Sequence, residues 1–316
     1  MKKYCFGVDI GGTTVKIGLF TISGGLIEKW EIATRKEEDS KYVLSDIVSS
    51  IEAKLKERKI AKKDVEGIGY GVPAPVSQDG VVSFAANLGW KNKAVTQELM
   101  ERTGLFVKGG NDVNTAALGE IWRGAAKEYK NVVMITLGTG VGGAIIVNGK
   151  AVPGATGGGG EVGHIHVEDE CKIPCGCGSY GCMEQYGSAS GVVRMARELL
   201  EKYDTSSILR NREITAKTVF DAVKMGDSIA IEVAEKFGKY VGMAMAAVSA
   251  TIEPEIFLVG GGVSKAGPII LKYIQKYYEV YAWQGIANKK FVLAKLGNDA
   301  GIYGAASYIS LRRDKD

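Results

Sequence analysis

One pattern occurs twice in this sequence: a short apolar strand, a glycine-rich turn and a second strand. The first copy spans residues 4–20 and turns through residues 9–14, with the sequence DIGGTT. The second spans residues 131–147, about 130 residues further along, and turns through residues 137–142, with the sequence LGTGVG. A repeat of this kind indicates two related halves. At 316 residues the chain has room for both, so we expect a two-domain α/β protein and not a single small module.

Both glycine turns are suited to binding phosphate. Successive glycine and threonine N–H groups form a nest for an anion, and a carboxylate at the end of the preceding strand can hold Mg²⁺ directly or through water. Neither turn is a Walker A loop or a GxGxxG turn that opens a helix, because a strand follows each. Either turn alone is also consistent with a plain β-turn, but two of them predict a nucleotide clamped in a cleft. In the first turn the predicted ligands of the nucleotide and its metal are Asp9, Gly11, Gly12, Thr13, Thr14 and Lys16.

A third glycine run extends the predicted nucleotide site. Residues 260–262 are all glycine and follow a buried-looking strand at residues 256–259. A backbone without side chains lets an adenosine lie directly against it. The same run is equally consistent with a structural turn from strand to helix. With the second turn it supplies the remaining predicted nucleotide ligands, which are Gly138, Thr139, Gly140, Gly142, Gly261 and Gly262.

An acid, Asp112, stands at the junction between a predicted strand, residues 105–108, and a predicted helix through residues 116–120. Phosphoryl transfer to an alcohol needs a carboxylate that orients the hydroxyl group and accepts its proton. Asp112 fits that role. Asp and Asn are also favoured as helix N-caps, so the sequence leaves two alternatives for Asp112, a general base or a cap.

A metal site is predicted from the cysteines. Three of the five, Cys175, Cys177 and Cys182, fall within eight residues, and two histidines precede them. Zinc in structural sites takes four thiolate or imidazole ligands in a tetrahedron, and glycines between the cysteines relieve the turns. The alternative is a chance cluster of free thiols. His164 and His166 share one face of an extended segment, so their spacing does not decide which of them is the fourth ligand.

Composition excludes several classes of protein. With 46% hydrophobic and 24% charged residues the chain is expected to bury a sizeable core. The net charge of +4 comes from 40 basic and 36 acidic residues that are interspersed, which gives little support to nucleic-acid binding. No window approaches the roughly 20 apolar residues of a membrane span, and no cleavable leader precedes the first strand. Five cysteines are too few for a secreted disulfide scaffold, so we expect a cytoplasmic protein, with Cys5 in the core and Cys171 on the surface.

Outside the two hairpins the sequence is mainly helical. Apolar residues recur with a period of 3.6 in residues 41–58, which predicts a surface helix packed on a sheet. Prolines in residues 71–75 forbid regular strand pairing, so a stiff loop is expected between strands at 65–70 and 81–84. Further helices are predicted at residues 94–103, 189–203, 215–225 and 229–250.

Together these motifs resemble the ROK group of sugar kinases and sugar-responsive repressors, which belong to the actin-like or hexokinase-type ATPase fold. The resemblance covers nearly the whole chain and includes residues 71–75, 87–90 and 300–305 as well as the motifs above. Within the group the sequence is most similar to the bacterial glucokinases. The resemblance implies an α/β fold of two ribonuclease H-like halves with a cleft between the domains.

The domains implied by the resemblance are unequal. The small α/β domain is expected to comprise residues 1–112 plus 300–316. The large α/β domain, residues 113–299, is expected to carry the zinc-binding loop.

The activity implied by the resemblance is ATP-dependent phosphorylation of glucose at its 6-hydroxyl, with Asp112 as the general base. The implied sugar ligands are Asn87, Asn111 and Asp112, with Glu161, His164 and Glu184 on the C1–C3 side. One ring nitrogen of His164 would bind zinc and the other would face the sugar, which selects His164 over His166 by analogy. The implied zinc ligands are His164, Cys175, Cys177 and Cys182.

One position departs from the family pattern. Ala74 stands where a glycine is usual between Pro73 and Pro75, and its methyl group could crowd the sugar. Other hexoses therefore stay open as substrates, namely N-acetylglucosamine, N-acetylmannosamine, fructose and mannose, and so do ADP and polyphosphate as donors. The expected ligands are a hexose, ATP, Mg²⁺ and structural Zn²⁺. A homodimer is expected because dimers are common among relatives, and neither a nucleic acid nor a membrane is an expected partner.

Two other functions compete with a kinase. A sugar-sensing repressor of the same family would share the fold without catalysis, but no helix-turn-helix segment precedes the first glycine turn, and both turns and Asp112 are intact. A structural ATPase of the actin type would leave the cysteine cluster and the sugar-side acids unexplained.

Overall fold

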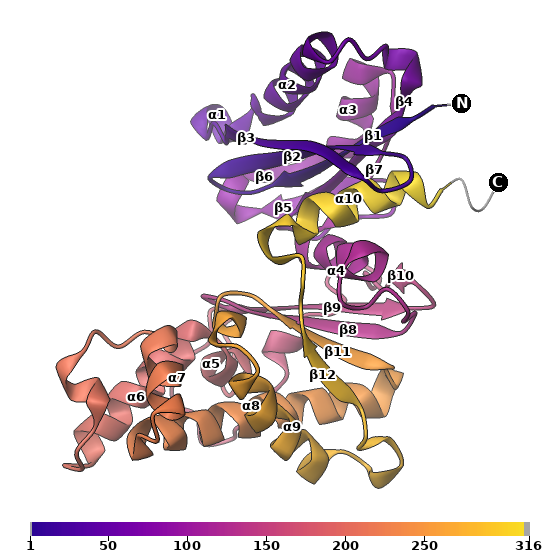
Figure 1. Ribbon diagram of the computed structural model, residues 1–316. Helices are drawn as coiled ribbons and strands as arrows, with labels where there is room; N and C mark the ends of the chain where they lie inside the picture. The colour runs from indigo at the N-terminus through magenta and orange to yellow at the C-terminus, as the bar shows by residue number, and fades with distance from the viewer. Residues whose placement is uncertain (1, 313–316) are drawn as a thin grey trace. The chain divides into compact units, whose positions relative to one another are not determined.

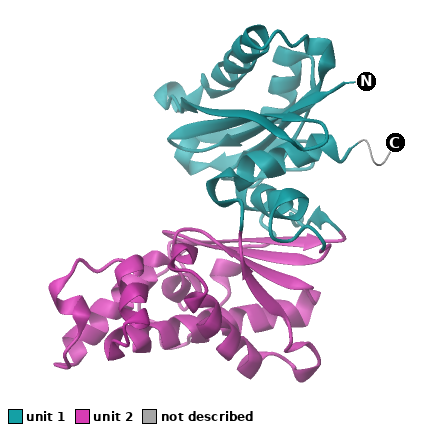
Figure 2. Cartoon of the chain, in the orientation of Figure 1, with its two compact units in different colours: residues 1–128, 149–159, 295–316 teal, residues 129–148, 160–294 magenta. Residues whose placement is uncertain are grey.

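The computed structural model describes residues 2–312, and its contacts divide the chain into two compact units (Figure 2). The first unit comprises residues 1–128, 149–159 and 295–316. The second comprises residues 129–148 and 160–294. Each unit is built around a sheet with helices packed on it (Figure 1), so the predicted α/β class is confirmed.

The structure groups residues 113–128, 149–159 and 295–299 with the first unit, whereas the family resemblance implied that they belong to the large domain. These residues include most of helix α4 (Asp112–Arg123). One side of α4 packs on α10 (Ala300–Ser310) and on strand β4 (Val65–Val72), and both of these belong to the first unit. The position of α4 in the sequence, directly after a strand, does not reveal this packing.

The first sheet has the strand order β3-β2-β1-β4-β7. Its other strands are β1 (Tyr4–Ile10), β2 (Thr14–Thr21), β3 (Leu26–Ala33) and β7 (Phe106–Asn111). The first three strands form an antiparallel meander, while β1, β4 and β7 run parallel. The remaining elements of this unit are α1 (Glu37–Ser40), α2 (Val43–Glu57), β5 (Val81–Ala85), β6 (Trp90–Ala94), α3 (Val95–Thr103) and β10 (Lys150–Ala151).

Burial in the first unit follows the sequence pattern. The edge strand β3 alternates between half-buried and exposed residues, as a strand with one solvated face does, whereas β1 in the middle is almost wholly buried. In α2 the buried residues are Val43, Leu44, Ile47, Val48, Ile51 and Leu55, which confirms the predicted apolar stripe.

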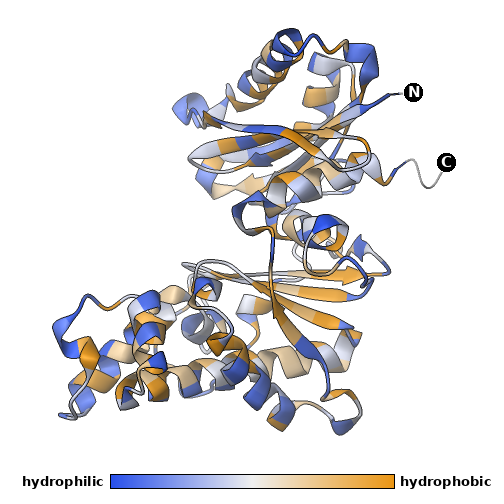
Figure 3. Cartoon of the chain, viewed as in Figure 1, coloured by the Kyte–Doolittle hydropathy of each residue, from blue (hydrophilic) through white to orange (hydrophobic). Residues whose placement is uncertain are grey.

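The second sheet includes β9 (Val141–Val147), β8 (Val132–Leu137), β11 (Ile256–Gly260) and β12 (Lys290–Leu293), in that spatial order. Strands β8 and β9 are antiparallel, and β8, β11 and β12 are parallel. Apolar residues dominate β8 and β11 (Figure 3) because both are inner strands, with a partner strand on each side. The helices of this unit are α5 (Glu184–Gly187), α6 (Ala189–Lys202), α7 (Ala216–Lys224), α8 (Ser228–Ile252) and α9 (Ile269–Tyr281).

Both predicted hairpins are confirmed, since β1 pairs with β2 and β8 pairs with β9 on either side of their glycine turns. Within residues 2–312, no helix combines the length and the apolar character needed to cross a membrane.

Candidate active site

The first glycine turn joins β1 to β2. A hydrogen bond of 3.0 Å from the Gly11 N–H to the Thr14 carbonyl oxygen closes it. Thr34, directly after β3, supports it from outside: its N–H donates to the Thr13 carbonyl at 2.9 Å and its hydroxyl donates to the Gly11 carbonyl at 2.7 Å. The backbone of the turn is thus held by a residue that the sequence of the turn does not reveal.

Two acids lie at one edge of the same sheet. Asp9 is next to last in β1, and Asp112 follows β7 directly as the first residue of α4. Because β1, β4 and β7 are parallel, their carboxyl ends meet at the same edge. The predicted metal-binding acid and the predicted base are therefore neighbours within the first unit.

The negative charge of Asp112 acts on Asp9. Burial first, and then the charge of Asp112, raise the pKa of Asp9 to about 6, while Lys16 acts to lower it. Burial also raises the pKa of Asp112, against the backbone N–H of Val113 and other hydrogen bonds that lower it. A divalent cation stabilises two close, partly desolvated carboxylates in their charged form, so the pair fits a Mg²⁺ site.

Asn111, and not Asp112, caps helix α4. The Asn111 side-chain oxygen accepts hydrogen bonds from the N–H groups of Val113 and Asn114 at 3.0 and 3.1 Å, and its amide nitrogen donates to the Ala74 carbonyl at 3.5 Å. Asp112 is already inside the helix, where its Oδ1 accepts the Val113 N–H at 2.9 Å. The alternative that Asp112 is the N-cap is therefore wrong, and its carboxylate is left for another role.

Asn87, the third predicted sugar ligand of this unit, lies beside the first glycine turn. A Cβ atom built on Gly12 would stand 3.1 Å from the Asn87 Cβ, so glycine at position 12 permits the approach. Ala74 is 5% exposed, and its methyl group belongs to the apolar core of the unit. Its backbone carbonyl, rather than its side chain, contacts the predicted sugar ligand Asn111.

The second glycine turn joins β8 to β9 and is closed by a 2.9 Å hydrogen bond from the Gly138 N–H to the Gly140 carbonyl. The N–H of Val141 donates to Oε2 of Glu184 at 2.8 Å. A Cβ on Gly140 would stand 2.5 Å from the same oxygen. Glu184, predicted as a sugar ligand, thus lies against this turn, although it is 43 residues away from Val141 in the sequence.

The third glycine run lies next to the second turn. Gly260 pairs with Thr136 across β11 and β8, and Gly261 has a φ of +85°. A Cβ on Gly261 would stand 2.5 Å from the Leu137 carbonyl oxygen, so only glycine fits there. A Cβ on Gly262 would meet no described atom within 4 Å. The structure therefore brings the predicted nucleotide residues of the second unit to one edge of its sheet.

The four predicted zinc ligands form one cluster. The ligand atoms of His164, Cys175, Cys177 and Cys182 all lie within 4.8 Å of one another. The Cys175 Sγ is 3.7 Å from the His164 Nδ1, and the Cys177 and Cys182 sulfurs are 3.7 Å apart. Ligands about 2.3 Å from a tetrahedral zinc stand about 3.8 Å from one another, so the donor set and its spacing fit this metal.

His166 makes other contacts. Its Nδ1 is 3.0 Å from the Tyr180 carbonyl oxygen and its Nε2 is 2.8 Å from the Asp169 carboxylate. Both ring nitrogens have partners, so the geometry favours His164 as the fourth ligand. His166 instead joins the two arms of the cysteine loop, since its backbone also bridges to Cys182.

The six predicted sugar ligands divide equally between the units. Asn87, Asn111 and Asp112 are in the first, and Glu161, His164 and Glu184 are in the second. Within the second, the Cys175 thiol lies 3.5 Å from Oε1 of Glu184 and 3.7 Å from the His164 ring, so Cys175 joins these two. Glu161 is exposed and precedes the short helical turn Val162–His164.

A pocket of about 540 Å³, between α6 and residues 214–216, lies beside the second glycine turn. Helix α6 is tied to the turn, because the Ala189 N–H donates to the Gly138 carbonyl at 2.7 Å and the Ser190 hydroxyl donates to the Thr139 carbonyl at 3.2 Å. Sequence reasoning missed this pocket since its walls come from two helices that carry no motif. The charged residues that line it are Arg194, Arg197, Glu198 and Glu201.

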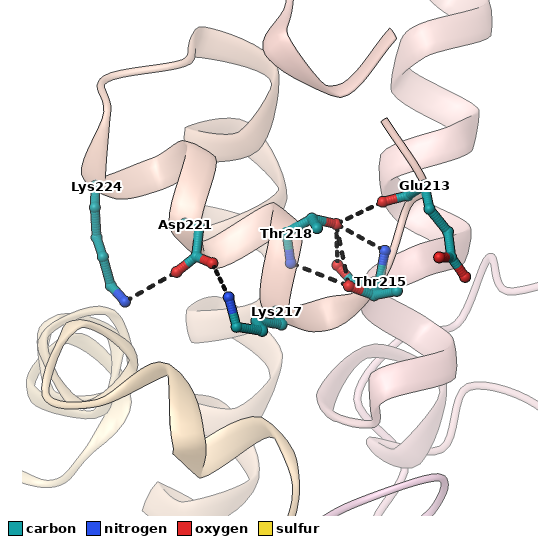
Figure 4. Close-up of polar contacts among 6 residues, drawn as sticks. All are labelled: Glu213, Thr215, Lys217, Thr218, Asp221 and Lys224. Carbon is teal, nitrogen blue, oxygen red and sulfur yellow. Dashed lines mark hydrogen bonds and ion pairs between the residues drawn. The ribbon is translucent and has the colours of Figure 1, made fainter. Parts of the chain in front are cut away.

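Helix α7 begins at this pocket, and its N-terminus is capped by side chains of its own first turn (Figure 4). Thr215 and Thr218 form a capping box, with the Thr218 N–H donating to the Thr215 hydroxyl at 3.1 Å and the Thr215 N–H donating to the Thr218 hydroxyl at 2.9 Å. Lys217 pairs with Asp221 at 2.6 Å, also on α7. The Thr215 hydroxyl is therefore engaged in capping α7. The polar side chains available to contact a ligand in this pocket are those of α6.

Comparison with known proteins gives one consistent result. The model of the ROK family matches residues 5–311. A glucokinase from Halalkalibacterium halodurans is 40% identical over 308 residues, which cover 96% of this chain and 93% of the relative.

Two solved structures resemble this one along its whole length. A ROK hexokinase from Thermus thermophilus has a TM-score of 0.83 at 28% identity and covers 99% of this chain and 100% of its own. A ROK family glucokinase from Streptomyces griseus, in complex with glucose and AMPPNP, has a TM-score of 0.73 at 32% identity and covers 98% of this chain and 99% of its own. These matches confirm the predicted actin-like ATPase fold.

Proposed function

Because the chain belongs to the ROK family, we propose that it is an ATP-dependent hexokinase that phosphorylates glucose at its 6-hydroxyl group. The observation that carries the proposal is the 40% identity to a glucokinase over 96% of the chain. The folded chain also retains both glycine turns and the Asp9–Asp112 pair, which favours catalysis over sugar sensing alone.

In this proposal Asp112 transfers the proton. Asn111 caps α4 and so leaves the Asp112 carboxylate available. Burial raises the pKa of Asp112, and a carboxylate of raised pKa is a stronger base toward an alcohol. Asp112 accepts the proton of the 6-hydroxyl while that oxygen bonds to the γ-phosphorus and the bond to ADP breaks.

Asp9 is proposed to hold the Mg²⁺ that accompanies the nucleotide. When bound, Mg²⁺ neutralises charge on the β- and γ-phosphates. The backbone N–H groups of residues 12–13 and 139–140 are proposed to bind phosphate oxygens, as glycine nests do. Their fixed geometry is supported by the hydrogen bonds that close both turns.

The nucleoside is proposed to occupy the pocket between α6 and residues 214–216. The pocket adjoins the second glycine turn, and its volume of about 540 Å³ suits a small organic ligand. Its two arginines are balanced by two glutamates, and Arg194 already pairs with Glu198 at 2.7 Å. This balance favours a neutral base over a polyphosphate chain, which requires an excess of positive charge.

The proposed sugar ligands are Asn87, Asn111, Asp112, Glu161, His164 and Glu184. The proposed structural zinc, on His164, Cys175, Cys177 and Cys182, would order the loop that presents the last three of these sugar ligands. Support comes from the cluster geometry and from the contact of Cys175 with both His164 and Glu184.

A coupled assay of the purified protein tests the proposal. With ATP as donor, we expect kcat/KM to be highest for glucose, clearly lower for 2-deoxyglucose, and lower still for N-acetylglucosamine, with mannose between glucose and N-acetylglucosamine. A site built to pair with sugar hydroxyls loses several kcal/mol when its own polar groups are left unpaired. Higher efficiency with N-acetylglucosamine or N-acetylmannosamine than with glucose would retain a kinase but overturn the glucose assignment. Higher efficiency with polyphosphate than with ATP would overturn the donor.

A further inference from the structure

The C-terminal helix α10 begins directly beside Asp9. A Cβ atom built on Gly301, the second residue of α10, would stand 2.6 Å from both Cγ and Oδ2 of Asp9 and 3.1 Å from its Cβ. Atoms this close overlap, so the Asp9 carboxylate occupies space that any other residue at 301 would fill.

Helix α10 is packed closely against three neighbouring elements. A Cβ on Gly7 of β1 would stand 2.0 Å from the Ile302 carbonyl, and one on Gly69 of β4 would stand 1.7 Å from the Ala305 carbonyl. On the α4 side, a Cβ on Gly304 would stand 1.6 Å from the Thr115 carbonyl. The backbone of α10 thus touches the backbones of β1, β4 and α4. A methyl group added at Gly301 therefore has to displace the Asp9 side chain rather than the helix.

We propose that Gly301 is a positioning residue for the phosphoryl-transfer reaction, because the absence of its side chain sets where the Asp9 carboxylate stands and so how well that carboxylate holds the Mg²⁺ of the nucleotide. The inference rests on the proposed role of Asp9. Alanine in a helix is more favourable than glycine by about 1 kcal/mol, so helix stability does not explain glycine at this buried position.

The direct test is Gly301→Ala, read by titrating Mn²⁺ into the protein with AMPPNP and following free Mn²⁺ by electron paramagnetic resonance. We expect Mn²⁺ to bind about 10-fold or more weakly, and the Mg²⁺ concentration for half-maximal activity to rise by a similar factor, because a displacement of about 1 Å at a reacting group can cost about 10²-fold. Glucose affinity, measured by calorimetry without nucleotide, should stay within about twofold.

Gly119→Ala is the matched control. It also adds a methyl group against α10, 2.4 Å from the Ala300 carbonyl, and its three nearest atoms belong to Ala300 and Gly304 rather than to Asp9. We expect a lower Tm and unchanged Mn²⁺ affinity of the folded fraction. If Gly119→Ala weakens Mn²⁺ binding as much as Gly301→Ala does, general packing of α10 is responsible and the inference is wrong.

A double-mutant cycle completes the test and covers the case of a poorly folding Gly301→Ala. Asp9→Ala vacates the space that the new methyl needs, so the double variant should recover the Tm lost by Gly301→Ala and bind Mn²⁺ no more weakly than Asp9→Ala alone. Independent, additive losses would overturn the positioning role. If Asp9→Ala itself leaves Mn²⁺ binding unchanged, the proposed role of Asp9 fails. Loss with Asp9→Ala but not with Gly301→Ala removes only the inference about Gly301.

Discussion

The two glycine turns have similar backbones and differ in how each acquires its acid. Each turn joins two antiparallel strands and is closed by a hydrogen bond of about the same length, 3.0 Å at Gly11 and 2.9 Å at Gly138. The first turn has Asp9 in its own preceding strand, where it pairs with Lys16 across β1 and β2 and lies two residues before Gly11. The second turn receives Glu184 from a distant part of the chain, through the Val141 N–H.

The difference shows that a repeated backbone pattern does not imply repeated chemistry. In the first unit the acid is covalently next to the turn, so its position depends on strand register and on the close approach of Gly301. In the second unit the acid depends on the loop that carries the cluster of His164 and three cysteines, because Glu184 follows Cys182 and contacts Cys175. We therefore expect the second turn, and not the first, to be sensitive to the metal.

The largest expected effect concerns the first unit. Asp112→Asn keeps the size of the side chain but removes the base, so kcat should fall about 10²–10⁴-fold while glucose affinity by calorimetry is largely retained. Asp79→Asn, the same change at an exposed loop position of the same unit, is the matched control and should leave kcat unchanged. Near-normal turnover by Asp112→Asn would remove Asp112 as the base.

The next effect tests the metal dependence of the second unit. Cys177→Ala should lose the expected zinc, about one per chain by metal analysis, and should weaken glucose binding by about 100-fold or more, because metal ligation and loop folding are coupled. Cys171→Ala changes a neighbouring thiol outside the cluster and should keep both zinc and glucose binding. A zinc-free Cys177→Ala protein with full activity would contradict the proposed site.

A third measurement compares the supports of the two turns. Glu184→Ala removes the charged acceptor of the Val141 N–H, so hydrogen exchange of that amide should accelerate about 10–100-fold. Thr34→Val removes only the hydroxyl that donates to the Gly11 carbonyl, a neutral hydrogen bond, and should accelerate exchange of the Gly11 N–H by about tenfold or less. Equal effects at both turns would mean that the charge of Glu184 adds nothing.

The smallest effect is a pH dependence of stability in the first unit. The pKa of Asp9 is about 6 in the folded protein, above its ordinary value of roughly 3.9, so the folded state holds a proton that the unfolded state releases between these pH values. Asp9 therefore lowers the free energy of unfolding as pH rises through this window, by about 1–3 kcal/mol at pH 7.5.

Asp9→Asn removes this penalty. Without metal or nucleotide, its stability gain over the wild type in urea unfolding should be larger at pH 7.5 than at pH 4.5. Identical gains at both pH values would show that Asp9 does not titrate in this range.

Much of the candidate site could be predicted from local sequence. The glycine turns, the strands around them and the cysteine spacing are patterns within about 20 residues, and the structure contains each of them. The family resemblance added the roles of Asn87, Asn111 and Glu184, which no spacing shows. The residues of the candidate site, in their order along the chain, could therefore be predicted without the fold.

Other features depended on contacts between distant segments. Asn111 and Asp112 are both good N-caps by residue type, and only the start of α4 shows that Asn111 takes this role and leaves Asp112 free. The spacing of the two histidines does not show which of them belongs to the cysteine cluster. The ring of His166 contacts Tyr180 and Asp169 instead, which separates His166 from that cluster. The α6 pocket and the domain assignment of residues 113–128 likewise follow from helix packing.

The sequence by itself determined which backbone and metal chemistry this protein can carry, because turn conformation and ligand spacing are set by residues that are neighbours in the chain. Only the tertiary structure decided which acid stands beside which turn and how closely. Glu184 reaches Val141, and Gly301 reaches Asp9, through packing that closes loops of many residues. Such contacts depend on the shape of both surfaces, and a single local segment contains only one of them.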